Sequence, residues 1–261
     1  AATESEIPTL LGLTARLNGR VPAEATELEF FASRAFSEVN LTIRDETRNL
    51  TSRALLEPGA RSDPFPLAGA VEPPTTLSIG LQYLQLGFVH IVPRGLDHIL
   101  FVLGLFLLGT RLRPLVWQVT AFTVAHAATL SLAVFDVVSL PATLVEPLIA
   151  LSIVYVAVEN VLTDRLHPWR PAVVFGFGLL HGLGFAGVLQ EIGLPQQERL
   201  LGLLSFNVGI ELGQLLVIAL ALAAVGWCRH RVWYRSRVGI PVSSAIAAVG
   251  LFWTLERALG G

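Results

Sequence analysis

The chain has 261 residues, of which 53% are hydrophobic and only 15% charged, and its formal net charge is −2. So apolar a composition is unusual for a soluble domain and typical of a protein that crosses a lipid bilayer several times. The slightly acidic balance argues against nucleic acid as a partner, and the single cysteine, Cys228, excludes an internal disulfide and a thiolate-rich metal site.

Residues 1–75 are expected to form a small β-rich domain outside the membrane. They hold 7 arginines against 11 carboxylates, and so carry a net charge of −4. Polar and apolar residues alternate over Leu10–Asn18, Glu27–Asp45 and Leu50–Leu56, a pattern typical of half-buried strands. The proline-rich run 64–74 is expected to act as a linker. The missing initiator methionine and the opening Ala1-Ala2-Thr3 favour a mature chain without its signal peptide over a truncated chain.

The rest of the chain is expected to be a helical membrane bundle. The amphipathic stretch Thr76–Val92, closed by Pro93, predicts an interfacial or re-entrant helix over residues 76–93. Residues 94–261 then contain apolar runs near the ~20 residues that cross a bilayer. These predict about six transmembrane helices, at 94–110, 114–135, 144–162, 171–190, 199–226 and 238–257. The predicted fold class is therefore membrane all-α, preceded by a small β-rich soluble domain.

The distribution of arginines predicts the orientation of the bundle. Connections with many arginines alternate along the chain with connections that have few, and the arginine-rich ones hold Arg111 and Arg113, Arg165 and Arg170, and residues 229–237. The positive-inside rule places the arginine-rich connections in the cytoplasm. The N-terminal domain is therefore expected to be extracytoplasmic, and the expected location of the chain is a bacterial inner or plasma membrane.

Polar and ionisable side chains inside the spans are the candidate functional residues, because a charge at the bilayer centre costs about 2.5–3.5 kcal/mol. Counting along each helix at ~1.5 Å per residue places most of them in the outer half of the membrane, with Glu159 near the cytoplasmic end as the exception. Gly178 and Gly182 are expected to let a neighbouring helix approach closely beside His181. The candidate ion-site residues of the outer half are Asp97, His98, His126, Glu146, His181, Asn207 and Glu211.

Histidines and carboxylates without a thiolate form a nitrogen and oxygen ligand set, which suits a divalent transition metal such as nickel or zinc. Such a site needs neutral imidazoles, so acidification should weaken binding. Each residue also has a purely structural interpretation. His98 could pair with Asp97, Asn207 could bond between helices, and Glu146 could cap the helix that continues at Pro147. The shared depth favours a metal or proton site.

Four blocks of the sequence resemble the HupE/UreJ family of hydrogenase and urease accessory membrane proteins. The blocks are Gly95–His98, Ala121–His126, Phe177–Ala186 and Phe206–Gln214, in the family's order. Members of the family are regarded as nickel permeases. The resemblance therefore implies an ion path through Asp97, His98, His126, His181 and Glu211. The chain departs from the family pattern where His90 and Pro93 stand apart instead of adjacent, and its N-terminal domain is similar to that of a longer branch of the family.

Three functions remain open. The first is transport or facilitated passage of a divalent transition-metal ion through the outer site, with Glu159-Asn160 as the candidate inner station. The second is a membrane-embedded enzyme in which His98, His126 and His181 hold a zinc ion and a carboxylate such as Asp97 or Glu211 is the general base. The third is a structural or assembly subunit of a larger membrane complex, its partners being other membrane subunits. We favour the first, with a metal ion and the lipid bilayer as partners.

Overall fold

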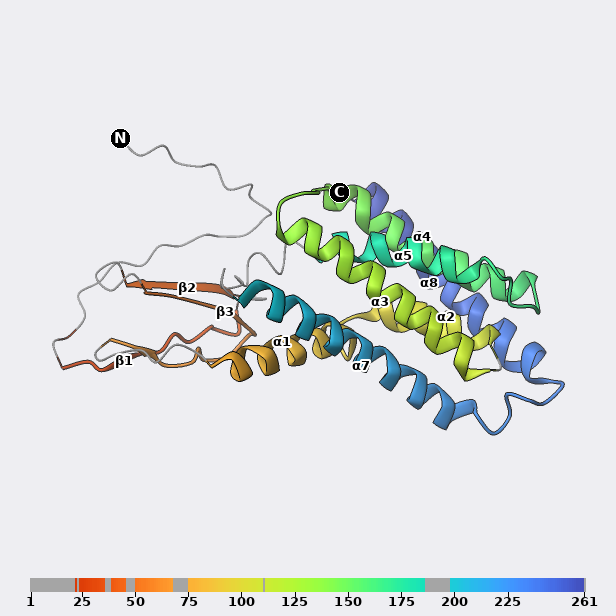
Figure 1. The fold of residues 1–261 in the computed structure, drawn as a ribbon, viewed down its shortest axis with the longest axis horizontal. Helices are drawn as coiled ribbons and strands as arrows, with labels where there is room; N and C mark the ends of the chain where they lie inside the picture. Colours follow the sequence, from red (N-terminus) through yellow and green to blue (C-terminus); the bar gives the residue numbers. More distant parts are fainter. Residues whose placement is uncertain are drawn as a thin grey trace. The chain divides into compact units, whose positions relative to one another are not determined.

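The computed structural model describes residues 22, 24–35, 39–45, 50–67, 75–109, 111–185 and 198–260. The chain divides into two compact units, Ala1–Glu72 and Pro73–Gly261. Figure 1 shows short strands in the first unit and helices in the second, so the fold is mostly helical with a small N-terminal strand region, as the sequence predicts.

The N-terminal unit contains two small antiparallel sheets. Its strands are β1 (Glu27–Leu28), β2 (Val39–Asp45), β3 (Leu50–Leu56) and β4 (Phe65–Pro66). Strand β2 pairs with β3, and β1 pairs with β4. The expected strand over Glu27–Asp45 is therefore two strands, and part of the expected linker is β4 because the buried Phe65 side chain packs into this unit. The expected strand over Leu10–Asn18 lies outside the described residues.

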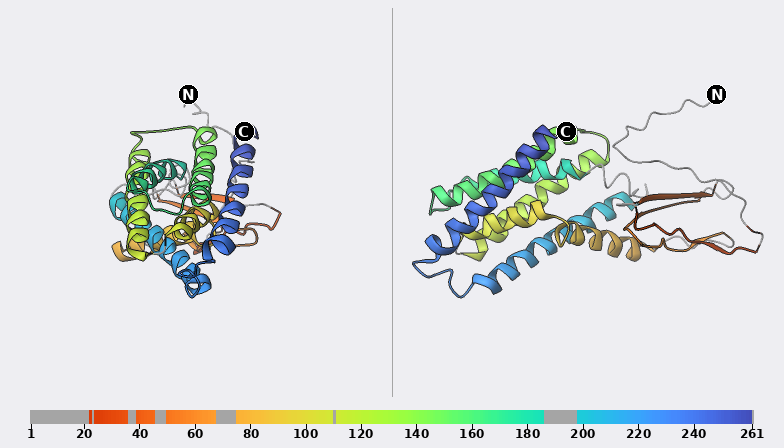
Figure 2. Two further views of the ribbon diagram at one scale, coloured as in Figure 1. Left: turned by 90° about the vertical axis from the view of Figure 1, so that its right-hand side faces the viewer. Right: turned by 180° about the vertical axis from the view of Figure 1, so that it is seen from behind.

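The second unit is a bundle of long apolar helices. They are α1 (Thr76–Ile91), α2 (Leu96–Leu108), α3 (Leu112–Val134), α4 (Ala142–Leu162), α5 (Arg170–Gly184), α7 (Arg199–Val225), the π-helix η2 (Arg235–Gly239) and α8 (Ile240–Leu259). Proline stands in the first turn of α5 and α8, where its missing N–H costs no helical bond. The closest helix pairs are α1 with α7, α3 with α5, and α4 with α8, and α2 packs among them (Figure 2).

Four of the described helices are long and apolar enough to cross a membrane, namely α3, α4, α7 and α8 together with η2. The pair α1 and α2 meets the same criterion as one bent span, which gives a fifth. The expected span at 171–190 corresponds to α5, of which the structure describes Arg170–Gly184. Residues 186–197 lie outside the described part, so this sixth span stays a prediction.

The chain bends by 69° between α1 and α2. Pro93 lacks a backbone N–H and disfavours helical geometry in the residue before it, and Val92 is accordingly extended. Helix α1 packs along α7, where Gly87 lies against the Phe206 carbonyl and Gly209 against that of Leu84. The bent pair is thus a broken span or a re-entrant loop, and the expected interfacial or re-entrant helix over residues 76–93 stays a prediction.

Helices α3 and α5 also approach closely, at two glycines of α5. A Cβ atom added to Gly178 would lie 2.5 Å from the Phe122 carbonyl oxygen, and one added to Gly182 would collide with the His126 carbonyl oxygen. The hydroxyl of Thr129 donates across the same crossing to the Leu179 carbonyl at 2.7 Å. The predicted close approach at these glycines is therefore confirmed, and it sets the distance between the helices that carry His126 and His181.

Candidate metal centre

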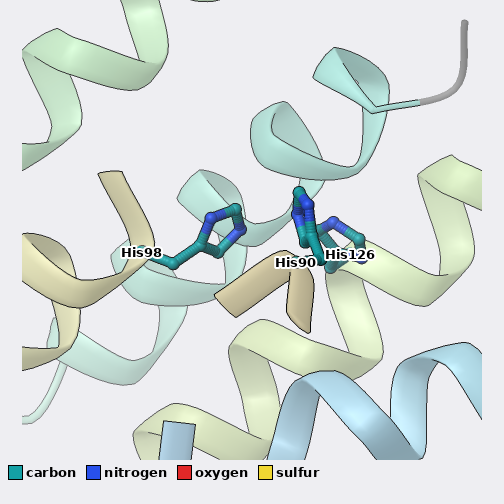
Figure 3. A group of neighbouring side chains, drawn as sticks. All are labelled: His90, His98 and His126. Atoms are coloured by element: carbon teal, nitrogen blue, oxygen red, sulfur yellow. The ribbon is translucent and has the colours of Figure 1, made fainter. Parts of the chain in front are cut away.

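Three histidines from the first three helices of the bundle meet in one space. His90 lies in the last turn of α1, His98 in the first turn of α2, and His126 in α3. One ring nitrogen from each lies within 4.8 Å of the others. Figure 3 shows how the three side chains lie. The ring centroids of His90 and His98 are 4.8 Å apart, and those of His98 and His126 are 6.0 Å apart.

His181 from α5 adds a fourth ring to this group. Its ring centroid lies 4.9 Å from that of His98, and its side chain is buried. It also packs on the rings of Phe101 and Phe122, which form the apolar wall of the group on this side. We call His90, His98, His126 and His181 the histidine cluster.

The four histidines share one chemical feature, a buried ring nitrogen without a hydrogen-bond partner among the described residues. Among the described residues, no hydrogen-bond partner lies near the Nε2 atom of any of the four histidines. A buried polar atom left unpaired costs about 1–3 kcal/mol. A ligand bound between the rings would satisfy these atoms, and the ring nitrogens of His90, His98 and His126 lie close enough together to share one.

The neighbours of two rings fix which nitrogen is free. Nδ1 of His181 lies 2.8 Å from the Phe177 carbonyl oxygen, which can only accept, so Nδ1 donates. Nδ1 of His126 lies 3.2 Å from Oδ1 of Asn207, and the amide of Asn207 is oriented by its own donation to the Leu203 carbonyl at 2.8 Å. A neutral imidazole that donates from Nδ1 has its lone pair on Nε2. Both rings are thus held in the tautomer that binds a metal through Nε2.

The cluster fits a transition-metal ion with a small adjustment. Metal–nitrogen bonds of about 2.0–2.1 Å in a tetrahedral site require nitrogens about 3.3 Å apart. The ring nitrogens of His90, His98 and His126, which lie within 4.8 Å of one another, would have to move closer together to bind one ion. Imidazole donors suit nickel, zinc and copper.

Two of the three predicted carboxylates are bonded to side chains outside the cluster. Asp97 accepts two hydrogen bonds from Arg257 of α8, at 3.1 and 3.2 Å. Glu211 accepts a bond of 2.7 Å from Thr120 and a second bond from Thr123. The Glu146 side chain is exposed. Of the residues predicted for this site, the structure therefore brings His98, His126 and His181 together. Asn207 lies within hydrogen-bond distance of His126. The three carboxylates are not members of this group.

His90 is the ligand candidate that the sequence analysis did not include. The sequence pattern predicts an interfacial or re-entrant helix for its segment, apart from the six expected spans. In one continuous helix His90 and His98 would be separated by about 12 Å along the axis. The bend at Pro93 instead brings their ring centroids to 4.8 Å. The signal in the sequence was a histidine just before this proline, immediately ahead of the Gly95–His98 block.

Comparison with known proteins identifies the family. The family model described as "HupE / UreJ protein" matches residues 71–257. The chain belongs to the HupE/UreJ family. The match covers α1 through nearly all of α8, so it includes all four histidines of the cluster, and with the apolar helices it makes this HupE/UreJ protein an integral membrane protein. Searches of curated proteins and of solved structures found no match to the chain.

Proposed function

We propose that this HupE/UreJ protein lets a divalent, nickel-like transition-metal ion cross the membrane through the histidine cluster. The observation that carries the proposal is the set of four buried Nε2 atoms for which the described residues offer no hydrogen-bond partner. They come from four helices, α1, α2, α3 and α5, so an ion bound by them would contact helices that are distant in the sequence.

The donor set supports passage of an ion over permanent retention. Four neutral imidazoles supply nitrogen ligands but no negative charge, and the number of charged ligands is one of the factors that set how tightly a site holds a divalent cation. Of the predicted carboxylates, Asp97 is paired with Arg257 and Glu211 accepts hydrogen bonds from two threonines. The same engagement counts against a zinc enzyme, because a general base must have its carboxylate free to reach a bound water.

The carboxylates near the cluster are proposed to attract the ion toward it. Asp97 keeps its side chain 25% exposed, and Arg257 also donates to the carbonyl of Glu146 at 3.4 Å. Asp97, Glu146 and Arg257 therefore share the end of the bundle at which α2 begins. Asn207 and Glu211 follow on α7, and we assign them to positioning of His126 and to the polar lining of the path.

We further infer that the end of the bundle rich in arginine faces the cytoplasm and that the N-terminal unit is extracytoplasmic. The test uses a chain in which the buried Cys228 is replaced by alanine and one cysteine is introduced at the exposed position Ser33 or Ser236. In right-side-out vesicles a membrane-impermeant thiol reagent is expected to label Ser33→Cys and to spare Ser236→Cys. Labelling of Ser236→Cys alone would reverse the assigned orientation.

Transport is tested with purified protein reconstituted into sealed vesicles that contain a metal-sensitive dye. We expect Ni²⁺ entry well above that of protein-free vesicles, and the double variant His126→Ala/His181→Ala at equal protein content should return entry to that background. A protein that binds Ni²⁺ tightly but admits none would contradict the permease and favour a resident metal. A protein that neither binds nor admits the ion would favour the assembly subunit.

A further inference from the structure

A pocket lies at the arginine-rich end of the bundle, apart from the histidine cluster. It has a volume of about 310 Å³ and lies between the end of α2, the end of α4 and the connection from α7 to α8, which Figure 1 shows at one end of the bundle. Along α2 it begins at Leu107, about 14 Å from His98 at ~1.5 Å per residue. We call it the arginine pocket, because Arg229, Arg231 and Arg235 line it.

Arg229 is a buried cation whose charge is only partly balanced. It is 6% exposed, and its Nη2 donates to the carbonyl of Gly109 at 2.6 Å. Gly109 caps the end of α2, and such a helix end carries about half a negative charge. Within the described ranges no carboxylate pairs with Arg229, whereas Arg170, the other buried arginine, has Glu159 at 3.2 Å. Positive charge therefore remains at Arg229.

Arg235 brings a second cation to the pocket. Its guanidinium donates to three carbonyls at the end of α4, at distances of 2.6–3.1 Å, those of Asn160, Val161 and Thr163. It thus caps α4 in the way that Arg229 caps α2. The caps explain where the two guanidinium groups are held. They do not neutralise them, because the end of a helix offers only about half a unit charge.

The remaining polar lining adds to this positive charge. Arg231 and His230 are exposed residues of the connection between α7 and α8, and both border the pocket. Asp164 is the one carboxylate among the described lining residues, and its Oδ1 lies 3.9 Å from Nε of the exposed Arg165. The pocket therefore has an excess of guanidinium groups. Their N–H donors match the oxygen atoms of a phosphate group.

The surroundings of the pocket indicate the level of the lipid headgroups. It lies where the spans α4 and α7 end. Trp227 and Trp233 of the same connection pack edge to face at 6.2 Å, and Trp227 is 74% exposed. Tryptophan is enriched at membrane–water interfaces. Leu107 and Leu108 give the pocket an apolar side. Basic pockets between membrane helices are typical sites for anionic lipid headgroups.

We propose that the arginine pocket binds a phosphate-bearing anion, and that its source is the headgroup of an anionic phospholipid. Only one of the five N–H donors of Arg229 has a partner among the described residues, so the others can bond the phosphate oxygens. Arg231 adds a second guanidinium from the exposed side. The phosphate balances the charge that the helix caps leave, and the apolar part of the lipid contacts Leu107 and Leu108.

The test measures lipid binding by the purified full chain in detergent with native mass spectrometry. Anionic phosphatidylglycerol is expected to bind at least about tenfold more tightly than zwitterionic phosphatidylcholine, and Arg231→Gln should weaken phosphatidylglycerol about fivefold. This variant should fold, because the Arg231 side chain is exposed and has no partner in the described part of the chain. The matched control is Arg237→Gln, an exposed arginine of η2 outside the pocket, which should bind like the wild type.

The double variant Arg229→Gln/Arg231→Gln should lose the preference for phosphatidylglycerol altogether, and Arg231→Gln alone decides the matter if the double variant does not fold. Ni²⁺ binding should stay unchanged in Arg231→Gln, because the histidine cluster is separate. Equal binding of the two phospholipids by the wild type, or wild-type binding of phosphatidylglycerol by Arg231→Gln, would overturn the proposed site.

Inorganic phosphate distinguishes the two sources of the anion. In excess it should not displace phosphatidylglycerol, since free phosphate makes no use of the apolar side of the pocket. Displacement by inorganic phosphate that Arg231→Gln weakens would support the phosphate site and overturn the lipid as its source.

Discussion

Replacement of His90, His126 or His181 by alanine is expected to abolish stoichiometric Ni²⁺ binding by the purified protein, with affinity falling by at least about a hundredfold. Each replacement removes one Nε2 lone pair from a set whose members have no hydrogen-bond partner among the described residues. The protein should stay folded, because the cost of the cavity left by the ring is partly offset by removal of a buried unpaired atom that costs about 1–3 kcal/mol. Isothermal titration with Ni²⁺, together with a check of folding by size-exclusion chromatography, measures both effects.

The control for this series is His230→Ala. His230 is exposed and lies at the arginine-rich end of the bundle, in the connection after α7. Its loss should leave the affinity for Ni²⁺ unchanged. The His90 variant is the most informative member of the series, since only the bend at Pro93 brings that ring to the cluster. Wild-type binding by His90→Ala would remove α1 from the metal centre.

Gly182→Ala is expected to destabilise the protein by about 1–3 kcal/mol, the usual cost of overpacking. The added methyl group would collide with the His126 carbonyl oxygen and with Thr129, and both belong to the tightly packed helix α3. Helix α5 must therefore move away, and it carries His181 with it. We expect a lower thermal midpoint in detergent together with weaker Ni²⁺ binding.

Gly176→Ala provides the comparison within the same helix. A Cβ atom at Gly176 would meet nothing within 4 Å. Helix propensity favours alanine over glycine by about 0.8–1.0 kcal/mol, so this variant should be at least as stable as the wild type. Equal stability and equal Ni²⁺ affinity of the two variants would show that the crossing of α3 and α5 does not set the geometry of the site.

The sequence was sufficient to predict the helical bundle and much of the histidine cluster. Long apolar runs identify membrane helices without tertiary information, because a bilayer requires a fixed length of apolar helix. Depth along a helix also follows from residue counting, which is why His126 and His181 could be expected at one level. The glycines of α5 also predict which face of that helix meets a neighbouring helix, since only small residues let helix backbones approach closely.

What the sequence could not predict depends on contacts between distant segments. Asp97 precedes His98 directly and was expected to act with it, yet it bonds Arg257, which lies 160 residues later. Glu211 was placed on the ion path by resemblance, and the hydroxyls of Thr120 and Thr123 hold it between α3 and α7. The direction of the chain after Pro93 likewise follows from the packing of α1 on α7, and that direction decides whether His90 reaches the cluster.

Four histidines from four helices are proposed to bind one divalent metal ion. X-ray absorption spectroscopy of the purified protein loaded with one equivalent of Ni²⁺ tests it most directly. We expect a first shell with three or four imidazole nitrogens, which should fall by one nitrogen in His90→Ala if any metal is retained. A first shell of oxygen atoms alone, or a protein that holds no Ni²⁺ after desalting at neutral pH, would contradict the account.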